Sequence, residues 1–158
     1  MKNLSIFLLI FSSACHTPAP TSATKADSTT PAVNASAVKT IIFNTGSRGY
    51  QKNILFTKDS VILVINSSFE DNPSKNIRTR ISAPEWDKLN ASLNGVDIPK
   101  IGELKSPTMK RAVDAGNHSA ITITTDADYN HGFDDYNPNE QLKKLMDVIQ
   151  EIEKDRNK

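Results

Sequence analysis

Apolar residues after position 37 recur in short runs that are bounded by turn residues, and two of these segments, 77–81 and 119–125, have the period of two that is typical of half-buried strands. The strands that this pattern predicts are 40–43, 53–57, 61–65, 77–81 and 119–125. Short polar turns, one of them at 58–60, separate the first three segments and favour antiparallel pairing. The segment 61–65 is apolar on both faces, so we expect it in a central position of the sheet.

Two other segments have the apolar period of a helix. In the first, Ser82 and Glu85 have the spacing of a capping box. Its apolar face consists of Trp86, Leu89 and Leu93. The second helix is expected to begin at Asn137, with Pro138 at its first position. Its apolar face consists of Leu142, Leu145, Met146, Ile149 and Ile152.

The segments between these elements are polar or interrupted by proline. We expect loops at 96–115 and 126–136, with one short strand at 101–104. The elements together predict an α+β fold, an antiparallel sheet of four to six strands with two helices packed on one face. The length of the apolar-rich region fits a single globular domain at 38–155.

The amino end has the layout of a secretory signal peptide. Lys2 supplies a positive start, residues 4–11 are almost wholly apolar, and small residues precede Cys15. An apolar run of this length rises only about 12 Å as a helix, which is too short for a hydrocarbon core of about 30 Å. We therefore expect 1–14 to be a signal peptide and not a stable membrane anchor.

Cys15 and the two small residues before it, Ser13 and Ala14, resemble the lipobox of bacterial lipoproteins, although Ser12 stands where the strict form has Leu. The resemblance implies that Cys15 is acylated and becomes the first residue, with the lipid bilayer as its partner. No acidic residue follows before Asp27, which favours the outer membrane and a periplasm-facing location. The alternative is an ordinary signal peptide with an incidental cysteine.

The segment that follows, 15–37, is nearly all Thr, Ser, Pro and Ala. It carries too few large apolar side chains to offset the entropy lost on ordering. We expect a disordered tether between Cys15 and the domain.

Composition and charge exclude several classes of function. The chain has 19 basic and 18 acidic residues and a net charge of +1, which argues against nucleic acid as a partner. Its single cysteine excludes a disulfide framework and a multi-cysteine metal site. Neither a Gly-x-Ser-x-Gly elbow nor a phosphate-binding P-loop is present, so the sequence predicts no enzymatic activity and no cofactor.

The acidic segment 126–135 is the strongest candidate for a metal site. Oxygen-bearing residues at 126, 128 and 130 match the first ligands of a calcium loop, but His131 stands where the sharp turn needs glycine. A zinc site would need three or four converging ligands, for which the histidines outside the tether are candidates. The weak candidates for calcium or zinc are Asp126, Asp128, Asp134, His118 and His131. A solvated acidic loop is the alternative.

The order of the predicted elements over roughly 38–152 is similar to that of the emfourin-type protealysin inhibitor domain. The resemblance implies a protease-binding role, with the turn 46–50 as a contact. That family has a Gly-Gly-Phe-type turn, and paired glycines are absent at this position here. The weak candidates for partner contacts are Gly46, Arg48, Gly49, Tyr50, Lys110 and Arg111.

The leading expectation is a membrane-anchored, non-enzymatic lipoprotein that acts as a binding or interaction module in the cell envelope. A protease inhibitor of the emfourin type is the first alternative. A metal-binding domain, or a metal-dependent hydrolase, is the second.

Overall fold

A computed structural model describes residues 38–110 and 116–157 of the chain. The expected signal peptide, the lipobox with Cys15, the tether and Arg111 lie outside the described residues. Within them, no helix is long and apolar enough to cross a membrane.

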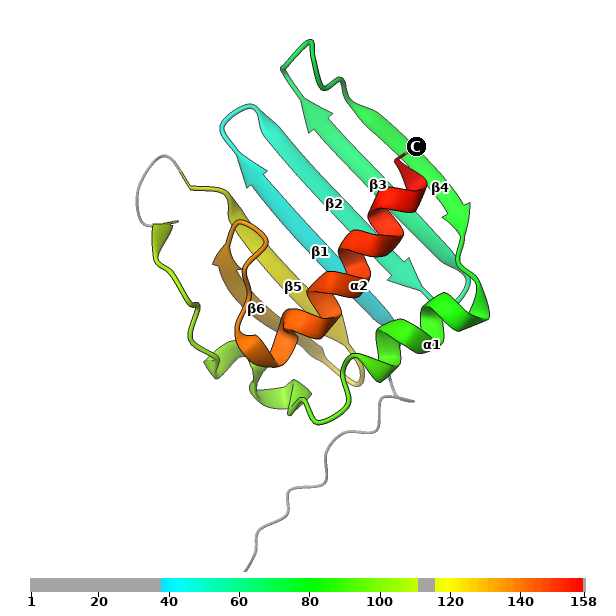
Figure 1. Ribbon diagram of the computed structural model, residues 1–158, viewed down its shortest axis with the longest axis vertical. Coiled ribbons are helices and arrows are strands. Elements are labelled where there is room, and N and C mark those ends of the chain that lie inside the picture. Colours follow the sequence, from blue (N-terminus) through cyan, green and yellow to red (C-terminus); the bar gives the residue numbers. More distant parts are fainter. Residues whose placement is uncertain (1–37, 111–115, 158) are drawn as a thin grey trace, which may run out of the picture. The chain divides into compact units, whose positions relative to one another are not determined.

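Six antiparallel strands form one sheet in the order β4-β3-β2-β1-β5-β6 (Figure 1). The strands are β1 (Thr40–Ser47), β2 (Tyr50–Thr57), β3 (Ser60–Ser67), β4 (Lys75–Arg80), β5 (His118–Thr124) and β6 (Asp128–Asp134). Three consecutive hairpins join β1 to β4, and β1 then pairs with β5 on its other side. The helices are α1 (Ala83–Ala91) and α2 (Glu140–Arg156), with a 3-10 helix η2 (Ile98–Glu103) between α1 and β5. The fold is α+β, as the sequence predicts.

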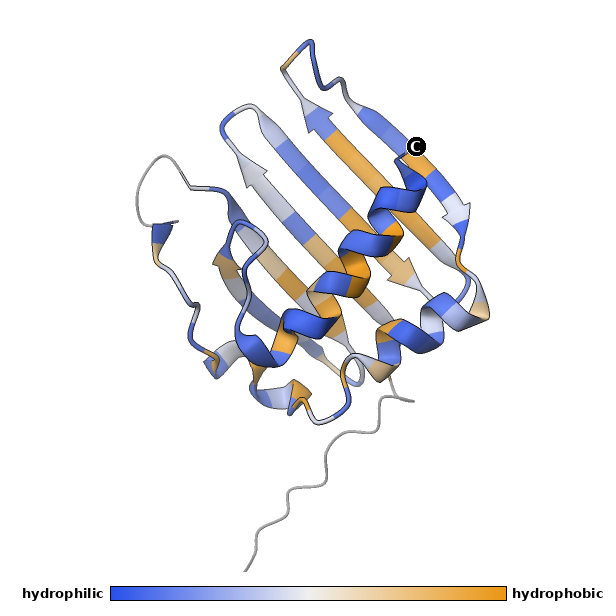
Figure 2. Ribbon diagram, in the orientation of Figure 1, coloured by the Kyte–Doolittle hydropathy of each residue, from blue (hydrophilic) through white to orange (hydrophobic). Residues whose placement is uncertain are grey.

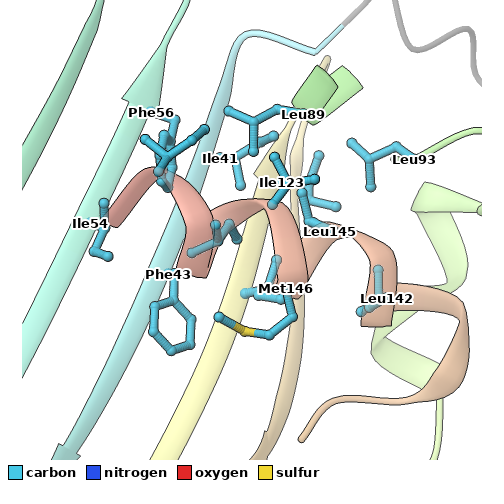
Figure 3. Close-up of a cluster of buried hydrophobic side chains, with 14 of the residues drawn as sticks. Ile41, Phe43, Ile54, Phe56, Leu89, Leu93, Ile123, Leu142, Leu145 and Met146 are labelled. Carbon is cyan, nitrogen blue, oxygen red and sulfur yellow. The ribbon is translucent and has the colours of Figure 1, made fainter. Parts of the chain in front are cut away.

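The core forms on one set of alternating strand positions, which we call the inward positions. They include Ile41, Phe43, Ile54, Phe56 and Leu63, each no more than 1% exposed. Buried residues of both helices, among them Leu89 of α1 and Leu142 and Leu145 of α2, belong to the same cluster (Figure 3). Burial of side chains of this size contributes roughly 1.5–3 kcal/mol each. The other set, the outward positions, stays half-buried or exposed on β1 to β4.

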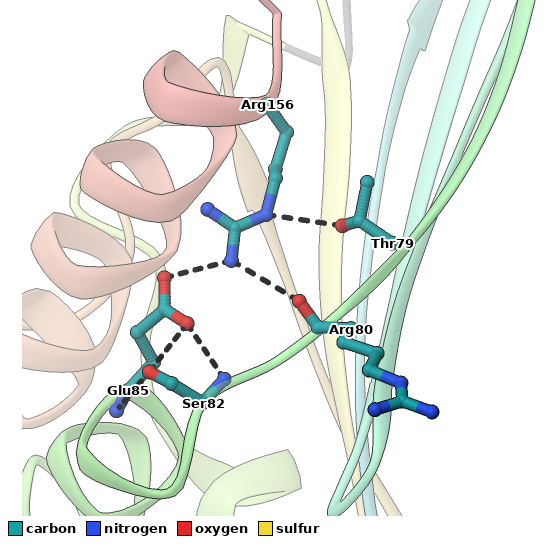
Figure 4. Close-up of polar contacts among 5 residues, drawn as sticks. All are labelled: Thr79, Arg80, Ser82, Glu85 and Arg156. Carbon is teal, nitrogen blue, oxygen red and sulfur yellow. Dashed lines mark hydrogen bonds and ion pairs between the residues drawn. The ribbon is translucent and has the colours of Figure 1, made fainter.

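A polar joint fixes the end of α2 to the start of α1 (Figure 4). The guanidinium of Arg156 lies 2.8 Å from a carboxylate oxygen of Glu85 and donates to the hydroxyl of Thr79 on β4 at 3.0 Å. Glu85 also completes the capping box with Ser82, whose backbone amide donates to the carboxylate at 2.8 Å. One carboxylate therefore serves the helix cap and the connection to the last turn of α2.

The structure confirms the five predicted strands and both helices, with boundaries that shift by a few residues. The central position expected for 61–65 holds in part, because β3 is paired on both sides but lies next to the edge strand β4.

Three local predictions are wrong. The segment 101–104 lies in η2 and its C-cap, where Pro99 lies near the start of the helix and fixes a helical φ. The expected loop 126–136 contains β6, because Tyr129, His131 and Phe133 alternate along it with a period of two. The cap of the last helix is Asn139 and not Asn137, since the side chain of Asn139 accepts from the amide of Gln141.

Candidate functional site

A hollow of about 690 Å³ lies on the outward positions at the end of the sheet where β1 turns into β2. Hydrophilic residues gather at this end of β1 and β2, whereas the opposite halves of both strands are hydrophobic (Figure 2). We call this end the polar end of the outward face. The antiparallel register brings residues from four strands together here.

Four primary amides, Asn44, Asn53, Gln51 and Asn66, line the hollow. Asn44 and Asn53 are directly opposite each other on β1 and β2, and the amide nitrogen of Asn53 donates to the side-chain oxygen of Asn44. Gln51 and Asn66 are opposite each other on β2 and β3, and both are exposed. A primary amide has two donor hydrogens and two acceptor lone pairs, so the four together present both kinds of group.

Gly46 leaves a gap in the middle of this surface. It pairs with Gln51 on one side and with His118 on the other, in one row across β2, β1 and β5. A Cβ atom at Gly46 would come within 3.0 Å of the carbonyl oxygen of Tyr50 and 3.3 Å of Cγ of Gln51. Glycine at this position therefore lets the neighbouring strand and its amide side chain approach closely.

The described lining of the hollow carries basic side chains and no Asp or Glu. Arg48, at the tip of the β1–β2 turn, and His118, at the start of β5, are both exposed. Val64 and Ala120 add two small apolar surfaces. The polar end therefore suits a neutral or anionic ligand with many hydrogen-bonding groups.

Lys52 also lines the hollow, but its ammonium is engaged in a buried cluster of polar groups. The side chain is 4% exposed, and Nζ lies 2.5 Å from a carboxylate oxygen of Glu153 on α2. It also donates to the hydroxyl of Tyr136 and lies 4.7 Å from the centre of that ring. The ammonium therefore links the sheet to α2.

The pKa values of this cluster follow from its burial and its charges. Burial lowers the pKa of Lys52, but the hydrogen bonds and negative charge of Glu153, together with Tyr136, outweigh it and raise the pKa above its ordinary value. Burial also raises the pKa of Tyr136, against the opposing influence of Lys52. The protonated forms of both groups are therefore favoured in the folded state.

Asp134, a candidate metal ligand, holds a loop in place. Its side chain is fully buried, and its carboxylate accepts hydrogen bonds from the hydroxyl of Thr108 at 2.5 Å and from the backbone amide of Lys110 at 2.6 Å. Hydrogen bonds to an ionised acceptor are among the stronger ones in proteins. The end of β6 thereby fixes the segment that carries Lys110.

Asp126 and Asp128 stabilise the turn between β5 and β6. The carboxylate of Asp126 accepts from the hydroxyl of Thr125 at 2.7 Å, from its neighbour's backbone amide and from the hydroxyl of Tyr129. These hydrogen bonds hold the pKa of Asp126 below its ordinary value, and the one from Thr125 has the largest effect. Asp128 accepts from the hydroxyl of Thr124 at 2.7 Å.

The two candidate histidines lie apart in the sheet. His118 is exposed at an outward position, whereas His131 is 2% exposed and stacks on Phe133 with ring centres 5.6 Å apart. Over 38–110 and 116–157, no three His, Cys, Asp or Glu side chains are grouped where they would hold a metal ion. The five candidate metal ligands therefore do not come together as one metal site in the described part of the chain.

The predicted partner contacts near the β1–β2 turn do lie together. Arg48 and Gly49 form its two-residue tip, and the carbonyl oxygen of Gly49 accepts from the amide of Ser68 at 2.9 Å. Lys110 lies in a separate exposed loop, where its ammonium is 3.5 Å from Asp135. The structure thus groups Gly46, Arg48 and Gly49 at the polar end and places Lys110 in a different loop.

The four amides were missed as candidates by reasoning from the sequence. Each occupies an outward position in the half of its strand that lies toward the β1–β2 turn, a pattern that becomes visible once the β1–β2 and β2–β3 turns are used to set the register. A scan against protein-family models and a search of curated proteins found no match for the chain. The site is therefore interpreted from its own chemistry.

Proposed function

We propose that this chain is a non-enzymatic lipoprotein of the cell envelope, anchored through an acylated Cys15, and that its folded domain acts as a binding module. The observation that carries the binding role is the hollow at the polar end of the outward face, with its four amides and its described lining free of carboxylates. In ligand-binding pockets, a small number of placed polar groups fixes the orientation of the ligand and provides specificity.

We further infer that both helices cover one face of the sheet and leave the outward face to a partner. The buried residues of α1 and α2 belong to the same cluster as the inward strand positions, which supports this arrangement. Ile42, Leu55 and Ile62 form one row across β1, β2 and β3 on the outward face, and all three stay only half-buried.

The location is proposed from the amino end of the chain. A lipobox-type cysteine with no acid directly after it supports the outer membrane, with the domain facing the periplasm. A tether of 22 residues, 16–37, has a root-mean-square reach of roughly 25 Å as a flexible coil. The domain would therefore stay close to the membrane and still reach a partner at some distance from it.

Fractionation of cells that express the full chain or its Cys15→Ala variant tests the anchor. We expect the full chain in the membrane fraction and the variant in the soluble periplasmic fraction. Equal membrane retention of both forms would contradict anchoring through Cys15. Cys15→Ser serves as the matched control, because it keeps the size and polarity of the side chain but cannot form the thioether.

Site-specific photocrosslinking in the same cells tests the binding face. A benzophenone amino acid replaces Asn44 in the hollow or, as a control, Asn76, which is exposed on β4 of the same face and outside the hollow. We expect a discrete adduct from position 44 that is missing from position 76. Identical patterns from both positions would contradict a binding role of the polar end.

A protease inhibitor of the emfourin type is a second candidate, which the exposed tip of the β1–β2 turn favours. The tip is held by Ser68, whose amide and hydroxyl both donate to the carbonyl of Gly49. A loop held in one conformation loses less entropy on binding. Titration of a thermolysin-type protease with the full chain tests this second candidate function. Absence of inhibition at micromolar concentration would contradict it.

A further inference from the structure

We propose that the polar end of the outward face binds an extended saccharide chain that carries carboxylate groups. This inference rests on the proposed binding role of that face and names the class of ligand. It is drawn from the shape of the surface, from the balance of donors and acceptors on it, and from its charge.

The shape is that of a groove across the strands. A second hollow of about 340 Å³ lies beside the first, and the two share Ser47, Gln51 and Asn66 in their linings. The row His118–Gly46–Gln51–Asn66 crosses β5, β1, β2 and β3. Three strand spacings make this row about 14 Å long, which is more than a single sugar ring needs. The groove therefore fits a linear chain better than an isolated small molecule.

The polar groups of the groove match a ligand rich in hydroxyls. Four amides line the larger hollow, and Ser67, Ser68 and Ser74 line the smaller one. Amides and hydroxyls both donate and accept hydrogen bonds, as sugar hydroxyls do, so each group of the ligand can be satisfied in either direction. Val64 and Ala120 offer small apolar surfaces for the C–H face of a sugar ring.

The charge of the groove favours a carboxylate on that chain. Arg48 stands exposed at the rim, and none of the described residues that line either hollow is Asp or Glu. A guanidinium pairs with a carboxylate through two parallel, charge-assisted hydrogen bonds, and a neutral sugar has no ionised acceptor for such a pair.

A nucleic acid fits the same groove less well. Single-stranded nucleic acids are bound through aromatic stacking and several phosphate contacts. Tyr50 is the aromatic residue among the described lining of the groove, and the ammonium of Lys52 is held by Glu153. Among the described residues that line the groove, Arg48 is therefore the exposed side chain that carries a permanent positive charge.

Isothermal titration calorimetry of the full acylated chain, in a detergent without a sugar headgroup, tests the proposal. The probes are tetragalacturonic acid, which carries carboxylates, and maltotetraose, which does not. We expect tetragalacturonate to bind about tenfold more tightly than maltotetraose, as one charge-assisted pair allows. Arg48→Gln, a substitution on an exposed turn, should abolish this difference.

Two asparagine variants locate the binding. Asn44→Ala should weaken the binding of tetragalacturonate about tenfold, because it removes an amide that lines the larger hollow. Asn76→Ala, on the same face of β4 but outside the groove, should leave the affinity unchanged. Thermal unfolding without sugar confirms that both variants are folded.

Three results would overturn the proposal. The first is no heat of binding for tetragalacturonate up to about 10 mM, far weaker than specific recognition. The second is equal affinity for both tetrasaccharides, and the third is equal loss from Asn44→Ala and Asn76→Ala. None of them affects the fractionation of Cys15→Ala or the position dependence of the crosslinks, so failure of the saccharide proposal is distinguishable from failure of the proposed function.

Discussion

At the scale of single residues, Lys52 contributes to the fold through its charge. It occupies an inward position of β2, directly opposite Thr45 of β1 and Ile65 of β3. Its ammonium is bonded to Glu153 and Tyr136. A buried ion pair is costly to desolvate, so its net contribution is small compared with the cost of removing one partner alone. Lys52 and Glu153 should therefore be strongly coupled.

Lys52→Met is expected to lower the free energy of unfolding by about 3 kcal/mol, because it leaves Glu153 without its buried counter-charge. The double variant Lys52→Met/Glu153→Leu should recover most of this loss. Denaturant unfolding of the two single variants and the double variant measures the coupling. The control is Lys88→Met, whose partner Glu151 is exposed, and we expect a change within about 0.5 kcal/mol. Additive losses at Lys52 and Glu153 would contradict the assignment.

Alkaline pH should weaken the same cluster. The pKa values of Lys52 and Tyr136 are raised in the folded state, so their contribution is fully present below the unfolded pKa values, about 10.4 and 10. It is lost as the pH rises through the folded values. The free energy of unfolding, measured with denaturant between pH 9 and 11.5, should fall more steeply for the wild type than for Lys52→Met/Glu153→Leu. Parallel curves for the two proteins would contradict this role of the cluster.

Gly49 is a residue whose backbone decides a turn. Its φ is 77°, and an added Cβ would come within 2.5 Å of Oγ of Ser68. We expect Gly49→Ala to destabilise the domain by about 1–2 kcal/mol, the cost of the left-handed region for a residue with a side chain. Gly132→Ala is the control, since its Cβ would meet nothing within 4 Å. Equal unfolding midpoints for the two variants would contradict this role of the turn.

At the scale of elements, Glu85 connects α1 to the end of α2. Partial burial raises the pKa of Glu85, but the hydrogen bonds from Ser82 and the charge of Arg156 outweigh it and hold the pKa below its ordinary value. The contribution of the carboxylate is therefore present above its unfolded pKa, about 4.3, and is lost as the pH falls through the lower folded value.

Glu85→Gln is expected to lower the free energy of unfolding by about 1 kcal/mol at pH 7, through the weakened cap and the lost ion pair. The difference from wild type should shrink as the pH falls below about 4. Glu140→Gln is the control, because Glu140 also lies in the first turn of a helix but is 83% exposed. A difference that stays constant down to pH 2.5 would show that the charge of Glu85 is not what stabilises the joint.

The local signals in the sequence sufficed for most elements. The short apolar runs of β1 to β3, the alternation in β4 and β5 and the capping box at Ser82 are short-range patterns, and the structure confirms the elements that they predict. The sequence predicts a loop in place of β6, because most residues of this segment are polar. The period of two of its three ring-bearing residues, Tyr129, His131 and Phe133, is the signal for the strand. The roles of Asp134 and Lys52 could not be predicted, since their partners lie 24 or more positions away in the chain.

At the scale of the whole molecule, the proposed anchor at Cys15 precedes a folded domain with a polar groove. The two parts make separate predictions. The groove depends on the register of β5, β1, β2 and β3, whereas the anchor depends on the chemistry of Cys15. Loss of the anchor should leave the stability of the domain unchanged, so Cys15→Ala and wild type should unfold at the same denaturant concentration.

The central claim is that a lipid on Cys15 holds a binding domain at a membrane. Mass spectrometry of the amino-terminal peptide of the chain, purified from its own cells, tests it most directly. We expect a peptide that begins at Cys15 and carries a diacylglyceryl group on the sulfur. A peptide in which Cys15 is unmodified, or a mature chain that begins after Cys15, would contradict it.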